Sequence, residues 1–146
     1  MKNELRFLTS VGFRPNKNDV DEFIPDFNTA DLSIIDEKPG AYVIVSQGQY
    51  FPYPGGESKV MYIGESDNLR RRLIDHYNEY KKVCGKQYSQ SCPSRYYYME
   101  SFGAKVYCFY TRGGQTSKNL ESDLIEYFTN RYGAIPVGNG ARSFRC

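Results

Sequence analysis

Residues 59–80, KVMYIGESDNLRRRLIDHYNEY, contain the clearest local pattern in the chain. A short apolar run, Val60 to Ile63, ends at Gly64. The next residues, Ser66 to Asn68, are typical helix N-caps, because their short side-chain oxygens accept the first free backbone N–H groups. A helical pattern begins at Leu69. The stretch therefore predicts a strand, a tight turn and a helix.

The predicted helix has a buried face and a basic edge. At about 100° per residue, the buried arc contains Leu69, Leu73, Tyr77 and Tyr80. Arg70 and Arg71 point away from it, whereas Arg72 and His76 lie one turn apart on its edge. An arginine beside the chain's only histidine suits the binding of a phosphate. The alternative at this point is a solvated arginine face and a structural histidine.

Composition sets broad limits on the protein. A chain of 146 residues is long enough for one domain with a core. The net charge of +2 does not by itself require a nucleic-acid partner, but basic residues cluster around the predicted helix. The four cysteines form no CxxC pair, so no zinc site is expected. Without a signal peptide or membrane-length apolar run, we expect a cytoplasmic protein with reduced thiols, although a Cys84–Cys92 pair stays open.

Two further strands follow from β-branched and aromatic runs at residues 40–45 and 105–111. Residues 46–58 are rich in proline and glycine and read as a loop. This loop joins two strands that are consecutive in the sequence, which predicts an antiparallel hairpin. Residues 94–101 fit either a short helix or a strand.

The chain divides into an extension and a main domain. Residues 1–38 are expected to pack on the domain formed by residues 39–146, with a short helix over 4–11 that ends at Gly12. The segment from Pro15 to Glu37 is rich in Asp and Asn, and we assign no chemistry to it.

The last predicted helix, residues 117–132, carries an acid in its apolar arc. That arc contains Leu120, Leu124, Ile125, Phe128 and Tyr132. Glu121 projects into the same arc, where a carboxylate is costly unless it is paired or binds a metal. A tyrosine hydroxyl or an arginine would also satisfy it, so both interpretations stay open here.

These residues, in this order, resemble the GIY-YIG nuclease family. Gly40-Ala41-Tyr42 stands where the family has G-I-Y, and Tyr62-Ile63-Gly64 matches Y-I-G. Arg72 and His76 fit the family's first helix, and Glu121 fits its metal-binding glutamate. Asn139 aligns loosely with a late asparagine. The resemblance covers about residues 39–140.

The resemblance implies a small α+β fold with a mainly antiparallel, three-stranded central sheet flanked by helices. It implies a metal-dependent DNA endonuclease that hydrolyses phosphodiester bonds with one Mg²⁺ or Mn²⁺ ion, as in DNA repair or restriction. The implied catalytic residues are Tyr42, Tyr62, Arg72, His76 and Glu121, with Glu121 as the metal ligand. Either tyrosine can orient or deprotonate water, with a slight preference for Tyr42. The residues assigned to substrate binding are Gly64, Arg70, Arg71 and Asn139.

Departures from the family pattern support a second hypothesis. Ala41 replaces a branched residue, the connection between Tyr42 and Tyr62 is long, and Glu65 follows Y-I-G where many members have a basic or small residue. A catalytically weak or inactive nucleic-acid-binding module on the same fold is therefore the alternative, with a partner protein supplying targeting. A globular protein whose basic helix is only structural is the third possibility. The sequence predicts no membrane partner. It gives no indication of the oligomeric state.

Overall fold

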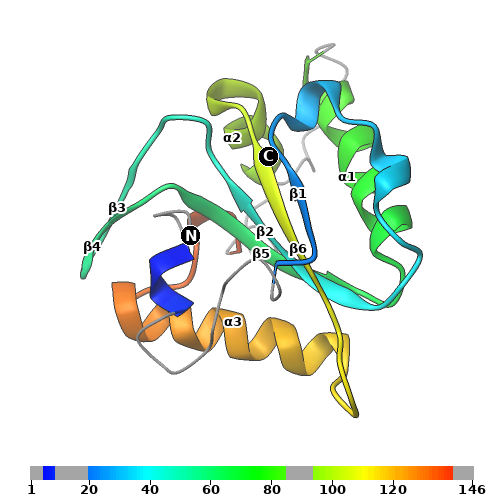
Figure 1. Ribbon diagram of the computed structural model, residues 1–146. Coiled ribbons are helices and arrows are strands. Elements are labelled where there is room, and N and C mark those ends of the chain that lie inside the picture. Colours follow the sequence, from blue (N-terminus) through cyan, green and yellow to red (C-terminus); the bar gives the residue numbers. More distant parts are fainter. Residues whose placement is uncertain (1–4, 9–19, 85–93, 140–146) are drawn as a thin grey trace.

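A four-stranded antiparallel sheet forms the centre of the molecule (Figure 1). The structure is a computed structural model, and it describes residues 5–8, 20–84 and 94–139. The strands, in spatial order, are β1 (Glu22–Ile24), β6 (Lys105–Tyr110), β2 (Gly40–Val45) and β5 (Val60–Ser66). The helices are α1 (Leu69–Cys84), α2 (Ser94–Phe102) and α3 (Ser117–Tyr132), with 3-10 turns η2 (Phe27–Thr29) and η3 (Leu32–Ile34). The predicted α+β class is confirmed.

The register of the central strands decides which side chains share a face. Strand β2 pairs antiparallel with β5 on one side, as the hairpin prediction requires, and antiparallel with β6 on the other. Tyr42 lies opposite Gly64, and Ala41 lies opposite Glu65. Because successive side chains in a strand point to opposite faces, Tyr42 and Gly64 belong to one face and Ala41 and Glu65 to the other. Strand β5 is an edge of this sheet.

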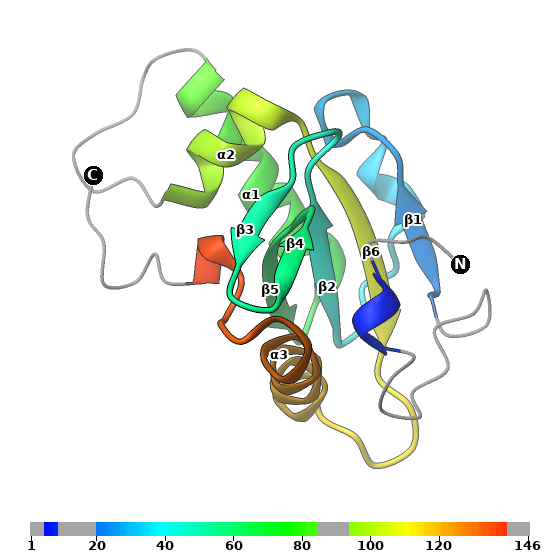
Figure 2. The same ribbon diagram turned by 90° about the vertical axis from the view of Figure 1, so that its left-hand side faces the viewer.

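Helices cover both faces of the sheet. Helices α1 and α2 pack on each other on one side, and α3 packs against β2 and β5 on the other (Figures 1 and 2). The arcs predicted to be buried are buried: in α1 these are Leu69, Leu73 and Tyr80, with Tyr77 half-buried. In α3 they are Leu120, Leu124, Phe128 and Tyr132, whereas Ile125, predicted in the same arc, is half-buried.

The expected number of strands is wrong, because the sheet has four strands and not three. The fourth strand, β1, comes from the Asp- and Asn-rich segment and pairs with β6. Its Phe23 stacks on Tyr107 with ring centroids 4.7 Å apart. The carboxylate of Asp21 accepts a hydrogen bond from the backbone N–H of Tyr110 at 2.8 Å. An acidic residue that reads as loop therefore completes the strand pairing.

The segment between β2 and β5 is also more regular than a loop. It contains a separate two-stranded ribbon, β3 (Phe51–Tyr53) and β4 (Gly56–Ser58). Phe51 and Tyr53 are buried, and the Tyr53 hydroxyl donates a hydrogen bond to the carbonyl of Val60 at 2.9 Å. Alternating aromatic residues anchor this ribbon, whereas its prolines and glycines suggested an irregular loop.

Helix ends follow the predicted capping. The side chain of Asn68 accepts from the backbone N–H of Arg71 at 3.0 Å, at the start of α1. Thr116 caps α3, which ends at Gly133 in the left-handed conformation with φ of 80°. Of the two alternatives for residues 94–101, the helix is correct, and Gly103 follows it with φ of 73°.

The N-terminal turn packs beside α3. Residues 5–8 form a 3-10 turn whose Leu5, Phe7 and Leu8 are buried, and Phe7 meets Phe128 edge-on at 5.4 Å. The rest of the helix expected over residues 4–11, including its end at Gly12, falls outside the described residues. Cys108 is buried and free, whereas the side chains of the other three cysteines are not among those described. No helix in the described ranges is long and apolar enough to cross a membrane.

Candidate active site

Four of the predicted site residues meet on the face of the sheet covered by α1. Tyr42 from β2, Tyr62 from β5, and Arg72 and His76 from α1 form this group. The Tyr42 hydroxyl shares a hydrogen bond of 2.5 Å with Nε2 of His76. The Tyr62 ring centroid lies 6.0 Å from that of Tyr42 and 5.8 Å from that of His76. We call these residues, together with Arg95 and Tyr96 of α2, the tyrosine–histidine cluster.

Gly64 makes room for this cluster. A Cβ atom at Gly64 would lie 2.5 Å from both Cζ and the hydroxyl oxygen of Tyr42, and 2.8 Å from the Tyr62 ring. No side chain fits at such distances, so the Tyr42 ring can lie across β5 only because residue 64 is glycine. The structure therefore gives Gly64 a packing role under Tyr42, in addition to its predicted place at the site.

His76 is neutral at the centre of the cluster. It is fully buried, and this burial lowers its pKa well below the usual range, with Arg72 and Arg95 adding to the effect. Its second nitrogen, Nδ1, lies 2.8 Å from the Tyr96 hydroxyl and shares a hydrogen bond with it. A neutral imidazole donates at one nitrogen and accepts at the other. His76 therefore links Tyr42 to Tyr96 in one chain of hydrogen bonds.

The two candidate bases differ in exposure. Tyr42 is 0% exposed, and burial raises its pKa well above 10, with a further contribution from Tyr62. Arg72 acts in the opposite direction, through its charge and through a hydrogen bond to the Tyr42 hydroxyl. Tyr62 is only half-buried. The slight preference for Tyr42 as the base disagrees with this burial, since a base must reach its water molecule.

Two cluster residues were missed in the sequence. Arg95 and Tyr96 open α2, where the residue pattern left helix and strand equally open. The Arg95 guanidinium lies over the rings of Tyr62 and Tyr96, at 4.6 Å and 5.2 Å from their centroids. The available signal was an arginine directly before a run of tyrosines. This signal does not indicate which other helix the arginine side chain would contact.

Glu121 does not join the tyrosine–histidine cluster. It lies beside Glu65, which points to the α3 face of β5, opposite to the face that carries Tyr42 and Gly64. The hydroxyl of Ser117, one turn before Glu121 in α3, donates to Oε1 of Glu65 at 2.7 Å. The expected convergence of Glu121 with Arg72 in one pocket stays a prediction, because the interactions of Glu121 are with Glu65 and Lys118 and those of Arg72 are with the tyrosines of the cluster. The two groups flank the edge strand β5 from opposite faces.

The pair Glu65–Glu121, which we call the carboxylate pair, has a donor set suited to a hard cation. Burial raises the pKa of Glu121, the charge of Glu65 raises it further, and Lys118 opposes them. Two repelling carboxylates with a nearby hydroxyl are the oxygen ligands that Mg²⁺ and Mn²⁺ prefer. Among the described residues, no group of three or more His, Cys, Asp or Glu side chains is arranged to hold a metal. The residues present thus offer two carboxylates, with water completing any cation's shell.

The neighbouring arginines of α1 have other surroundings. Nε of Arg70 donates to the carbonyl of Ile35 at 2.7 Å, and its guanidinium forms an ion pair of 3.7 Å with Glu37. Arg70 therefore fastens the segment before β2 to the start of α1. The side chain of Arg71 is exposed. Neither arginine is brought to the cluster, so their assignment to substrate binding receives no geometric support.

The side chain of Asn139 is hydrogen-bonded to the backbone of the edge strand β5. Its side-chain Nδ2 donates to the carbonyl of Ile63 at 2.7 Å, and its Oδ1 accepts from the N–H of Ile63 at 2.9 Å. The amide thereby completes hydrogen bonds that a further strand would otherwise make. The expected contact with substrate has no support in these bonds, which instead fix the outer edge of β5.

A comparison of the chain with known protein families, with curated proteins and with solved structures finds no match in any of the three.

Proposed function

We propose that the protein is a metal-dependent endonuclease that hydrolyses phosphodiester bonds in DNA, similar in its chemistry to GIY-YIG nucleases. One observation carries the proposal: four residues from two strands and a helix meet around the hydrogen-bonded Tyr42 hydroxyl. A buried group of this kind needs a reason, because a hydrophobic core of the same size would be easier to build.

Arg72 would bind the nonbridging oxygens of the phosphate that is cleaved. Its guanidinium is half-buried beside Tyr42 and Tyr62, and planar N–H donors match the geometry of phosphate oxygens. Negative charge grows on those oxygens in the transition state, so a fixed cation there lowers the barrier.

Tyr62 is the tyrosine better placed to orient or deprotonate the attacking water, because its side chain is partly exposed. Tyr42 would act as a positioning residue that holds His76 through the 2.5 Å hydrogen bond. His76, neutral and hydrogen-bonded on both nitrogens, would hold the Tyr42 and Tyr96 hydroxyls in fixed orientations.

The carboxylate pair, Glu65 and Glu121, would hold the divalent cation across the edge of β5 from the cluster. A bound Mg²⁺ or Mn²⁺ supplies Lewis-acid stabilisation of the leaving oxygen. Glu121 remains the principal candidate ligand, and Glu65 adds a second carboxylate. The metal site is tested separately from the tyrosine–histidine cluster, because different residues are substituted in each test.

The decisive assay is Mg²⁺- or Mn²⁺-dependent cleavage of plasmid, branched and single-stranded DNA. Wild-type protein should nick at least one of these substrates, and Glu121→Ala should not. Glu126→Ala is the matched control, since Glu126 is exposed on the same helix, and it should cleave at the wild-type rate. Cleavage that survives Glu121→Ala would remove the metal role of that residue.

A nucleic-acid-binding module without catalysis is the second candidate. The observation that favours it is the full burial of the Tyr42 hydroxyl together with the extra carboxylate Glu65 beside Glu121. This candidate predicts salt-sensitive DNA binding with no cleavage under any divalent cation, including Mn²⁺.

A further inference from the structure

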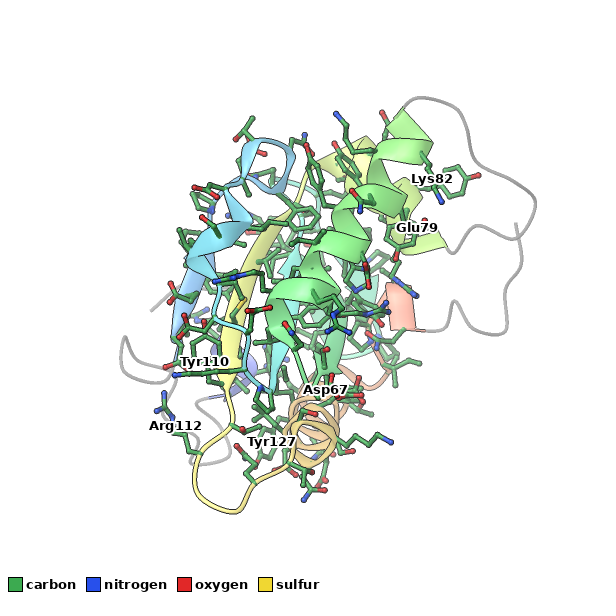
Figure 3. All side chains as sticks on the ribbon, turned by 90° about the vertical axis from the view of Figure 1, so that its right-hand side faces the viewer. Asp67, Glu79, Lys82, Tyr110, Arg112 and Tyr127 are labelled. Carbon is green, nitrogen blue, oxygen red and sulfur yellow. The ribbon has the colours of Figure 1, made fainter. Side chains whose placement is uncertain are left out.

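Most arginines described in the fold have identifiable partners. Arg112 forms an ion pair with Asp21 at 2.5 Å on the far edge of the sheet (Figure 3), and Arg70 pairs with Glu37. Arg131 donates to the carbonyl of Gly55 at 3.0 Å. These arginines are explained by the folded chain alone.

Arg72 and Arg95 are different. Both contribute positive charge at the same buried groups, since each lowers the pKa of His76. Within the described residues, neither guanidinium forms an ion pair with a carboxylate. Glu79, the acid close enough to influence Tyr96, instead pairs with Lys82 at 2.7 Å, and both are labelled on α1 in Figure 3.

Arg95 also has an unused hydrogen-bond donor. Its Nε atom is buried and has no hydrogen-bond partner within the described part of the chain. An unsatisfied buried donor typically costs about 1–3 kcal/mol, and more when the group is charged. Two like charges in one place are unfavourable in the free protein, and an anion bound by the guanidinium would relieve this repulsion.

We propose that Arg95 of α2 is a second phosphate-binding residue, which holds a backbone phosphate of the same nucleic acid whose scissile phosphate Arg72 would bind. The inference rests on the proposed function, and it extends the substrate contact from α1 to α2. The rings of Tyr62 and Tyr96 hold the guanidinium between them, which restricts its rotamers before the phosphate arrives.

The test is the salt dependence of binding to a fluorescein-labelled 20-base-pair DNA duplex in EDTA, where no metal-dependent cleavage occurs. Arg95→Gln should weaken binding roughly tenfold and should reduce the slope of log K against log[salt] by about 1. Arg95→Lys should keep the wild-type slope, because it keeps the charge. A slope unchanged in folded Arg95→Gln would overturn the inference.

Arg131→Gln is the matched control. Arg131 also stacks on a tyrosine, with its guanidinium carbon 4.8 Å from the centroid of the Tyr132 ring, so the substitution removes the same charge and the same type of contact elsewhere. It should leave the slope unchanged. An equal change in both variants would mean that net charge, rather than a site at Arg95, controls binding.

A second measurement does not depend on a variant that folds. In wild-type protein, the NMR signal of the Arg95 Nε–H group should move when the unlabelled duplex is added, because the phosphate binds the guanidinium that carries it. The nicking assay, run in parallel, separates the two proposals. Cleavage with an unchanged slope would remove only the Arg95 site, whereas a changed slope without cleavage would remove only catalysis. A wild-type protein that does not bind the duplex would contradict both.

Discussion

The two faces of strand β5 carry opposite charge. On the α1 face, two arginines surround a neutral histidine and three tyrosines in the tyrosine–histidine cluster. On the α3 face, the charge of Glu65 raises the pKa of Glu121, and the charge of Lys118 opposes this effect. The charge on one face suits an anion and the charge on the other suits a cation, and a single edge strand separates them.

Under the proposed function, this contrast would give each face a different task in phosphodiester hydrolysis. A phosphate backbone needs cations to bind it, and the reaction needs a hard metal ion to stabilise the departing oxygen. The arginines on the α1 face suit phosphate binding, and the carboxylates on the α3 face suit metal binding. Because the two groups lie on opposite faces of β5, substitutions on each face should produce different combinations of lost binding and lost cleavage.

The largest predicted effect is a loss of cleavage. Measured together with DNA binding, it should distinguish the two faces of β5. Arg72→Ala and Glu121→Gln should each reduce the cleavage rate by about 10²–10³-fold, as expected for loss of a group that stabilises transition-state charge. Only Arg72→Ala should also weaken DNA binding in EDTA, by roughly tenfold. Rates come from plasmid nicking and affinities from fluorescence anisotropy. Equal loss of metal-free binding in both variants would mean that both faces contact the DNA directly.

The next effect concerns the geometry that allows the cluster to exist. Gly64→Ala places a Cβ atom 2.5 Å from the Tyr42 ring and its hydroxyl. Both residues are buried, so the unfolding free energy should fall by about 1–3 kcal/mol. Denaturant unfolding measures this loss. Gly114→Ala is the control, because no atom lies within 4 Å of its added Cβ, and it should change stability by less than about 1 kcal/mol. A stable Gly64→Ala protein would show that Tyr42 does not need to cross β5.

Local sequence patterns predicted the helices and strands near the site more accurately than the contacts between side chains of different elements. The cap at Asn68 and the buried arc of α1 were predictable, because helix periodicity and short-range hydrogen bonds depend on neighbouring residues. The convergence of Tyr42 and His76 was also expected, since it follows from hairpin and helix together with the family resemblance. The short strand β1 was not predicted, because its pairing with β6 depends on residues far away in the sequence.

The arginines of α1 illustrate what sequence spacing leaves open. Three consecutive arginines look equivalent as a basic run, yet Arg70 binds the preceding segment, Arg71 is exposed and Arg72 enters the cluster. Glu121 was correctly identified as an unusual acid near an apolar stripe. Its position relative to Arg72 depends on which face of β5 meets α3, and periodicity within α3 carries no information about that face.

A smaller effect should appear in the pH dependence of stability on the cluster face. Burial lowers the pKa of His76 in the folded protein below its unfolded value of 6.5, so the unfolded chain binds more protons. Stability is therefore full above pH 6.5 and is lost as the pH falls toward the folded pKa, by up to about 1.4 kcal/mol per pH unit. Thermal or denaturant unfolding between pH 7.5 and 5 should show this slope. His76→Gln should flatten it, and an unchanged slope would contradict a buried neutral histidine.

The smallest effect has the opposite sign and belongs to the carboxylate pair. The raised pKa of Glu121 means that its folded carboxyl group binds a proton more tightly than in the unfolded chain, where the pKa is 4.5. Its favourable contribution is present below pH 4.5 and is lost as the pH rises through the folded pKa. Glu65→Gln keeps an acceptor for the Ser117 hydroxyl but removes the repulsion, so it should stabilise the protein at pH 7 by about 0.5 kcal/mol or less, because the groups are partly solvated.

Magnesium should distinguish this repulsion from a simple packing effect. A cation bound between Glu65 and Glu121 stabilises only the folded state, by an amount set by RT ln(1 + [L]/Kd). Addition of 10 mM Mg²⁺ at pH 7 should therefore raise the unfolding free energy of the wild type more than that of Glu65→Gln or Glu121→Gln. Glu126→Gln controls for general salt effects, since its exposed carboxylate lies elsewhere on α3. Equal stabilisation of all four proteins would mean that the two carboxylates repel each other without binding a cation, which is the arrangement expected of a DNA-binding module that does not cleave.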